Sequence, residues 1–309
     1  MTQETHVDSV GAAVAWLMLG VAGGLGLDIC AKELLATYSL NQFVFLRTLA
    51  GLTIFMLLAR QFGGIRSLAT RQWKWHLLRT ALACGAMFGF FYALARMPLV
   101  NALTLAFTSP LIVTALTPYF LGEHVGWRRW TAVLVGFGGV LLILRPGAGL
   151  LSAASIAVLI AAICYAGLAL TSRHLGKIET TFSLSVYVMA GPLLISAAMS
   201  IDGEWRAPDA FGWFLFIAAG ACSVIAWVGI IGAYRRASPS LLAPLEYAGL
   251  IGGAVAGYLI WDEVPDRWVV AGALIIITSG LFVVYREIWQ ARGNTEPAPD
   301  KIQGLGPQS

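Results

Sequence analysis

The sequence predicts an all-α integral membrane protein in which ten transmembrane helices form two inverted repeats of five helices around a central cavity. Composition is the first reason: 58% of the 309 residues are hydrophobic and 12% are charged, about half the charged share of a soluble domain. The second reason is that ten apolar stretches are long enough to cross a bilayer, since one crossing takes ~20 apolar residues. The third reason is an internal repeat.

The two halves of the chain align with each other. Residues 95–103 (ARMPLVNAL) match residues 236–244 (RASPSLLAP) at a shift of 141, and residues 120–130 match residues 260–270 at nearly the same shift. Each copy holds five apolar stretches, and five is odd, so the second copy must enter the membrane from the opposite side. Two inverted copies around a midplane axis are usual in secondary transporters.

Charge and Gly/Pro/Asn clusters divide the chain into spans. The first copy has spans near 11–32, 41–59, 76–95, 99–121 and 130–145, and the second near 151–172, 182–201, 210–234, 240–260 and 268–286. We therefore expect four parts: a cytoplasmic N-terminus (1–10), a first repeat (11–146), a second repeat (150–287) and a disordered cytoplasmic tail (288–309). Pro110 and Pro118 in the fourth span, and Pro244 in the ninth, mark places where backbone carbonyls lose their helical partners.

The distribution of Lys and Arg predicts the orientation. The loops on the side of the termini carry 14 of these residues, the other loops carry 5, and Arg47 lies inside a span. The positive-inside rule then places both termini in the cytoplasm. The N-terminus MTQETHVDSV has no cationic region of a cleaved signal peptide, so we expect the first span to be retained. The net charge of +4 is spread over short loops, which argues against a nucleic-acid partner.

Charged residues at membrane depth usually face the bundle interior or a cavity. Asp28 and Arg47 lie at similar depth in the first two spans and can pair, and Lys32 follows Asp28 by one turn. One interpretation is a structural ion-pair cluster that holds the two spans together. The other is a site for a zwitterion, in which the carboxylate binds an ammonium and the guanidinium binds a carboxylate.

Glu246 in the ninth span has no basic neighbour within its span, and its counterpart in the first copy is Leu105. Desolvation would favour the protonated form of such a carboxyl, which suits a proton carrier. Alternatively, Glu246 caps the backbone near Pro244, or pairs with Arg235 or Arg236 at the mouth of the bundle.

Aromatic side chains within the spans are candidates for a cavity lining, because they lie away from the interfacial belts where Trp and Tyr collect. For any one of them, core packing is the alternative. As a set they could line an apolar cavity in which a few polar groups orient a ligand. The substrate-binding candidates among them are Phe88, Tyr92, Phe107, Tyr165, Trp227 and Tyr247.

A family resemblance rests on an ordered set of segments. FLRTLAGL around Arg47, ALARMPLVNALTL, LGE at 121–123 and GFGGVLLIL at 136–144 resemble the drug/metabolite transporter (DMT) superfamily, specifically its ten-helix EamA-type permeases. Among these the chain is most similar to the YddG-like amino acid exporters. The resemblance implies a cavity lined by spans one to four and six to nine, and Lys32 and Arg47 match basic residues often found in the family. Asp28 and Glu246 match no motif, so proton coupling and facilitative transport are both open.

We therefore expect a secondary transporter in the bacterial cytoplasmic (inner) membrane that exports neutral, including aromatic, amino acids by alternating access. Nucleosides, flavins or drug-like solutes would suit the same cavity, and a non-transporting membrane subunit is a remote alternative. An enzyme is not expected, because the four histidines stand apart and no cysteine has metal-ligand spacing. The expected partners are a small-molecule substrate and the lipid bilayer, with protons if Glu246 titrates. We expect no cofactor, no metal and a monomer.

Overall fold

The computed structural model describes residues 2–62, 64, 68–121, 126–144, 152–175, 178–201, 205–234, 236, 242 and 245–293. Every regular element in these ranges is helical. The elements are α1 (Thr2–Leu35), α2 (Leu40–Leu57), η1 (Ala59–Phe62), α3 (Trp73–Leu94), α4 (Leu99–Ala106), α5 (Ser109–Leu121), α6 (Trp127–Leu144), α7 (Ala153–Leu175), α8 (Thr181–Met199), α9 (Ala210–Tyr234), α11 (Ala248–Trp261) and α12 (Arg267–Gly293).

Seven segments of the described chain are long and apolar enough to cross a membrane, by length and composition. They lie at 11–35, 40–57, 73–94, 99–120, 153–172, 182–199 and 210–233. Three shorter apolar helices cover 130–144, 248–261 and 267–282. The prediction of an all-helical, multi-pass membrane protein is confirmed at this level.

The described chain departs from the predicted boundaries in several places, among them the ninth span (240–260), where α11 begins only at Ala248. Helix α1 begins at Thr2, inside the segment predicted as an N-terminus, and α12 continues to Gly293, inside the segment predicted as a tail. Residues 294–309 of that tail lie outside the described residues. The predicted span 99–121 is two helices, α4 and α5, because Pro110 has no N–H for the carbonyl of Ala106 and its ring would clash with that carbonyl.

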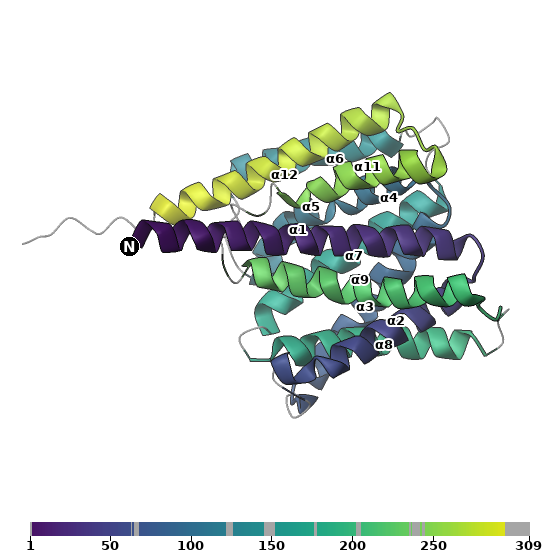
Figure 1. Cartoon of the computed structure of the whole chain (residues 1–309). Helices are drawn as coiled ribbons and strands as arrows, with labels where there is room; N and C mark the ends of the chain where they lie inside the picture. Colours follow the sequence, from purple (N-terminus) through teal and green to yellow (C-terminus); the bar gives the residue numbers. More distant parts are fainter. Residues whose placement is uncertain are drawn as a thin grey trace, which may run out of the picture.

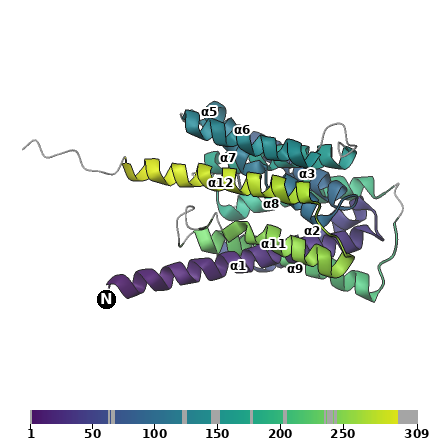
Figure 2. The ribbon, with the colours of Figure 1, turned by 90° about the horizontal axis from the view of Figure 1, so that it is seen from above.

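The two halves of the chain are interleaved. Helix α1 packs along α9, and α3 packs along α7, so each of these pairs joins one helix from each half. Helix α2 packs against α8 and α9, and α6 packs against α12. Figure 1 shows α6 and α12 together at one edge of the bundle and α2 and α8 at the other, and Figure 2 shows the same bundle from above.

Helices α2 and α8 begin in the same way. Ser39 precedes α2 with an extended backbone, and its hydroxyl accepts a hydrogen bond from the Gln42 N–H at 3.3 Å. Thr180 precedes α8, and its hydroxyl accepts from the Ser183 N–H at 3.1 Å. Each hydroxyl satisfies an amide that has no partner inside its helix. Ser39 and Thr180 are separated by the repeat shift of 141.

Close backbone contact between α1 and α9 depends on glycine. A Cβ placed on Gly229 would lie 2.4 Å from the backbone nitrogen of Gly20 and 2.8 Å from the carbonyl oxygen of Trp16. Small residues let helices approach to this distance in membranes, where packing rather than hydrophobic exclusion holds helices together. This contact sets the position of α1 beside the cavity described next.

Candidate functional site

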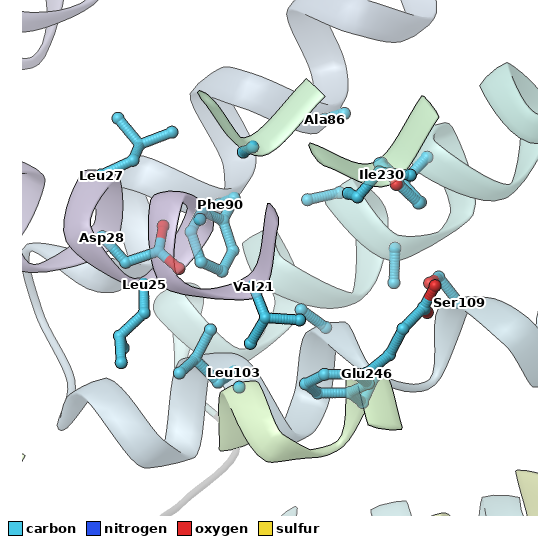
Figure 3. A pocket seen from close by; sticks show the side chains of 18 of the residues that line it. Val21, Leu25, Leu27, Asp28, Ala86, Phe90, Leu103, Ser109, Ile230 and Glu246 are labelled. Carbon is cyan, nitrogen blue, oxygen red and sulfur yellow. The ribbon is translucent and has the colours of Figure 1, made fainter. Parts of the chain in front are cut away.

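A cavity of about 460 Å³ lies among helices from both halves of the chain. Its wall comes from α1, α3, α4, α5, α7, α9 and α11, together with Phe107 and Glu246 in the connections (Figure 3). Most of the wall is Gly, Ala, Val, Leu and Ile. The volume falls within the ~300–1,000 Å³ range of small-molecule sites, and a mostly apolar wall with few polar groups is typical of them.

Two carboxyl groups lie in this wall. Asp28 comes from α1, and Glu246 comes from the segment just before α11. Figure 3 shows Asp28 beside Phe90 and Glu246 on the side of Ser109, so the two acids come from different parts of the wall. A charge at this depth costs solvation energy unless neighbouring groups or a bound solute compensate for it.

Aromatic rings accompany the two acids. Phe90, Phe107 and Tyr165 line the cavity, and Tyr165 interacts electrostatically with Glu246. Behind the wall, the ring of the buried Tyr247 lies 5.2 Å from that of Phe107 at an interplanar angle of 33°. Tyr247 therefore supports a lining ring without lining the cavity itself.

Arg47 lies outside the cavity wall, contrary to its predicted place at the substrate site. Its side chain is buried on α2, its Nη2 donates to the sulfur of Met87 at 2.8 Å, and its guanidinium lies over the ring of Phe91 at 5.2 Å. Asp28 and Arg47 interact electrostatically, but they form no ion pair in the described part of the chain. The predicted direct pairing was wrong, because the side chain of Arg47 contacts Met87 and Phe91 on α3.

Lys32 also lies outside the wall, and its partner is not Asp28. Its ammonium forms an ion pair with Glu263, donates to the carbonyl of Met97 at 3.1 Å and lies over the ring of Trp261 at 5.2 Å. The predicted i, i+4 contact with Asp28 is therefore replaced by contacts with distant segments. An ammonium with these partners is not available to a solute in the cavity.

Local backbone geometry positions Glu263. Helix α11 ends at Asp262 in the left-handed conformation (φ 53°), and the N–H of Glu263 donates to the carbonyl of Gly257 at 3.0 Å. This turn is a common way to end a helix, and Asp tolerates the left-handed region better than most residues. The sequence analysis assigned no partner to Glu263. The sequence feature that could have drawn attention to this residue is the internal repeat, in which Glu263 of the second copy aligns with Glu123 of the first.

The remaining predicted residues lie away from the cavity wall. Phe88 packs against the main hydrophobic core. The guanidinium of Arg96 lies over the ring of Tyr92 at 3.7 Å, and Trp227 is 43% exposed on α9. The structure thus brings four of the ten predicted residues together in the wall: Asp28, Phe107, Tyr165 and Glu246.

The suggested alternative partners of Glu246 are only partly within the described residues. Arg236 donates to the carbonyl of Gly232 at 2.8 Å, and its guanidinium lies over the ring of Trp16 at 5.3 Å. Pro244 and Arg235 lie outside the described residues.

A second polar cluster, not predicted from the sequence, surrounds Glu179 in the connection between α7 and α8. Thr70 and Ser183 donate hydrogen bonds to its carboxylate, and the Nε2 atom of His76 lies 3.7 Å from it. Burial raises the pKa of Glu179, but the two hydrogen bonds and His76 outweigh burial and lower it below its usual value. In the described residues no group of His, Cys, Asp and Glu has the geometry of a metal site.

The comparisons with known proteins identify the family. The model of the EamA-like transporter family matches residues 12–145. A riboflavin transporter of Vibrio cholerae is 33% identical over 232 residues, which cover 74% of this chain and 78% of that protein. The chain belongs to the EamA-like transporter family.

Other relatives of this EamA-like protein carry different names. An S-adenosylmethionine uptake transporter of Rickettsia bellii is 27% identical over 277 residues, covering 89% of this chain and 94% of the relative. The pseudopaline exporter CntI of Pseudomonas aeruginosa is 28% identical over 254 residues, covering 82% and 89%. One crystal structure matches with a TM-score of 0.64 at 19% identity, covering 91% of this chain and 98% of the other, which shows the fold alone.

Proposed function

We propose that this protein is a secondary transporter that moves a small metabolite across the cytoplasmic membrane by alternating access. The cavity is the proposed substrate site. The observation that carries the proposal is that the wall combines α1, α3 and α4 of the first half with α7, α9 and α11 of the second. A site between two halves can open to either side when one half moves relative to the other.

The proposed architecture has ten spans in two inverted repeats, 11–146 and 150–287, with both termini in the cytoplasm. Helix packing supports it. In the proposed repeat, α7 is the counterpart of α1 and α9 is the counterpart of α3. Replacing both helices of the α1–α9 contact by their counterparts gives the α7–α3 contact, which the structure also has. The hydroxyl caps at Ser39 and Thr180 occupy equivalent positions in the two copies. Seven long apolar segments and three shorter ones are compatible with ten crossings if the three shorter helices also cross.

Neutral, including aromatic, amino acids are one proposed substrate class, and nucleosides or flavins are another. The aromatic wall suits a planar group in either class. The zwitterion site that led to amino acids depended on Arg47 and Lys32, and both of these cations have other partners. Relatives include proteins named for uptake and for export, so the export direction is also a proposal that the flux measurement tests.

The test uses purified protein in liposomes and labelled tyrosine, adenosine, riboflavin and S-adenosylmethionine, each placed inside or outside. Gly24 lies in the cavity wall and has no atom within 4 Å of a Cβ built on it, so Gly24→Phe can project into the cavity. Leu19 on the same helix is 47% exposed, and Leu19→Phe is the matched control. We expect one or more solutes to move through the parent protein and the control, and Gly24→Phe to abolish the flux.

Two results would contradict the proposal. Flux that Gly24→Phe leaves unchanged would separate transport from this cavity. If folded protein moves no solute of the panel, the proposal that it transports these metabolite classes is wrong.

A further inference from the structure

Gly280 of α12 lies against the side chain that supports the cavity wall. A Cβ atom built on Gly280 would lie 2.1 Å from the hydroxyl oxygen of Tyr247 and 3.4 Å from its Cζ atom. Non-bonded heavy atoms pack best at about 3.5 Å or more, so even one added methyl group overlaps this hydroxyl. The Tyr247 hydroxyl thus occupies space that exists only because residue 280 has no side chain.

Tyr247 extends from this contact to the cavity. Its side chain is buried, and its ring lies 5.2 Å from the ring of Phe107 at an interplanar angle of 33°. Phe107 lines the cavity, and so does Glu246, the residue directly before Tyr247. A rigid aromatic side chain therefore touches α12 with its hydroxyl and the cavity wall with its ring.

Helix α12 itself supplies no lining residue in the part of the chain that the structure describes. It packs mainly along α6, at the edge of the bundle in Figure 1, and it also contacts α4 and α5. Tyr247 is thus a specific connection from this outer helix to the cavity.

The internal repeat shows that this connection is a feature of the second copy. At the shift of 141, Gly280 corresponds to Gly139, and Tyr247 corresponds to Ala106. A Cβ on Gly139 would lie 2.9 Å from the carbonyl oxygen of Gly272, so Gly139 permits close contact between α6 and α12. Ala106 has no ring and lines the cavity directly. The two glycines therefore serve different contacts, and the contact of Gly280 is with a side chain at the site.

We propose that Gly280 is a positioning residue of the substrate site: it leaves room for the Tyr247 hydroxyl, and the Tyr247 ring then fixes Phe107 in the cavity wall. The inference rests on the proposed transport function and adds a residue outside the wall that determines which solutes fit. A methyl group at position 280 would displace the hydroxyl by more than ~1 Å. Because the backbone of α12 blocks one direction, the buried ring moves towards its other neighbours, including Phe107, and the cavity becomes narrower for bulky ring systems.

Fluorine NMR tests the positioning without any transported solute. Phe107 is replaced by 4-fluorophenylalanine, and the resonance is recorded in the parent, in Gly280→Ala, in Tyr247→Phe and in the double variant. We expect Gly280→Ala to shift the resonance, because the ring that packs against position 107 moves. The double variant should give the resonance of Tyr247→Phe alone, since removing the hydroxyl removes the overlap with the added methyl group.

Flux in liposomes tests the effect on the site. For each solute of the panel that the parent moves, Gly280→Ala should raise KM and change kcat little. The rise should be about 10-fold for the bulkiest solute, the lower end of the effect of one methylene in an apolar pocket. Adding Tyr247→Phe should return KM to the value of Tyr247→Phe alone. A role of Gly280 in folding only would lower the amount of active protein, and hence the maximal flux, without changing KM.

Gly272→Ala is the matched control, because it adds the same methyl group to the same helix about two turns earlier. There the Cβ would lie 2.4 Å from Cγ1 of Ile143 and 2.7 Å from the carbonyl oxygen of Gly139, on α6 and not at the site. This variant should lower the unfolding temperature but keep the fluorine resonance and the KM of the parent. Adding Tyr247→Phe should not restore its stability.

The outcomes separate this inference from the transport proposal. An unchanged fluorine resonance in Gly280→Ala, or an unchanged KM, would show that α12 does not position the site, and transport would stand. A raised KM that persists in the double variant would also overturn the inference, because the Tyr247 hydroxyl would not be its cause. If the parent moves no solute, the transport proposal is wrong, and the fluorine comparison alone decides whether Gly280 positions Phe107.

A second variant keeps the test decisive if Gly280→Ala does not fold. Tyr247→Leu removes the ring that supports Phe107 and leaves Gly280 in place. It should shift the fluorine resonance and change KM. Parent values of both quantities in Tyr247→Leu would overturn the inference.

Discussion

Lys32 at the end of α1 and Glu263 after α11 form an ion pair, although 231 residues separate them in the sequence. The second carboxylate oxygen of Glu263 accepts a hydrogen bond from the N–H of Leu99, the first residue of α4, at 2.8 Å. One carboxylate thus connects α1, α4 and the end of α11. Asp28 lies one turn before Lys32 on α1, and Leu103 lies one turn after Leu99 on α4. Both Asp28 and Leu103 line the cavity wall.

Glu263→Ala should lower the stability of the folded protein by about 2–4 kcal/mol, because it leaves the Leu99 amide without its acceptor and the Lys32 ammonium without its carboxylate partner. Glu263→Gln should cost less, since the amide oxygen can still accept from Leu99. The measurement is thermal unfolding in detergent at constant lipid content.

A double-variant cycle provides the control for this prediction. Lys32→Met combined with Glu263→Gln should cost less than the sum of the two single changes, since the first change removes the partner that the second would leave buried. Strict additivity would mean that the ion pair contributes nothing to stability.

Helix positions could be predicted from the sequence because bilayer thickness fixes the length of an apolar segment. Pro110 also marked a break inside a predicted span, since its missing N–H acts locally. The ends of α1 and α12 were less predictable. Their residues beyond the apolar stretch are helical, and apolar length carries no information about a helix that continues past the membrane.

The site was predictable only in part, because depth in the membrane follows from sequence while direction around a helix does not. Asp28 and Arg47 do lie close enough to interact, but the side chain of Arg47 points to Met87 on α3. Lys32 was one turn from Asp28, yet its partner lies in the other half of the chain. Such contacts depend on how the two halves pack.

Gly229→Ala should destabilise the protein by ~1–3 kcal/mol, since the added methyl group would overlap the backbone of Gly20 and force α1 and α9 apart. Gly24→Ala is the matched control, because the corresponding space is open. The measurement is the unfolding temperature of each variant, which should be lower for Gly229→Ala than for Gly24→Ala. Equal temperatures would show that α1 and α9 can separate without loss.

The lowered pKa of Glu179 predicts a pH-dependent contribution to stability. Burial opposes ionisation of this carboxyl, but the hydrogen bonds from Thr70 and Ser183 and the nearby His76 favour it more strongly. A folded-state pKa below the unfolded value, which is ~4.3 for Glu, gives stability that is present above the unfolded value and is lost as the pH falls through the folded one.

Glu179→Gln should therefore make the unfolding temperature less dependent on pH between about pH 6 and about pH 3, because the variant has no carboxyl to protonate there. Glu33→Gln, at an exposed position, should keep the parent's dependence. An unchanged slope in Glu179→Gln would mean that this carboxyl titrates equally in the folded and unfolded states.

Glu246 offers the sharpest test of proton coupling. It lines the cavity and interacts electrostatically with Tyr165 and Tyr247, while its counterpart in the first copy is the buried Leu105. A proton carrier must gain and lose its proton during the transport cycle, and Glu246→Gln keeps a similar shape and hydrogen bonding but cannot titrate. If Glu246 carries the proton, this change should abolish flux driven by a pH gradient and leave exchange at equal pH in place.

The pH gradient is the variable that separates the two mechanisms. Flux through the parent protein is measured with the interior of the liposomes more acidic than, equal to, or more alkaline than the exterior, at zero membrane potential. A coupled carrier would accumulate substrate against its gradient in only one of the unequal conditions, and Glu246→Gln would lose that accumulation. Flux that is indifferent to the imposed gradient would leave facilitative transport, with Glu246 acting only as an acidic group of the cavity wall.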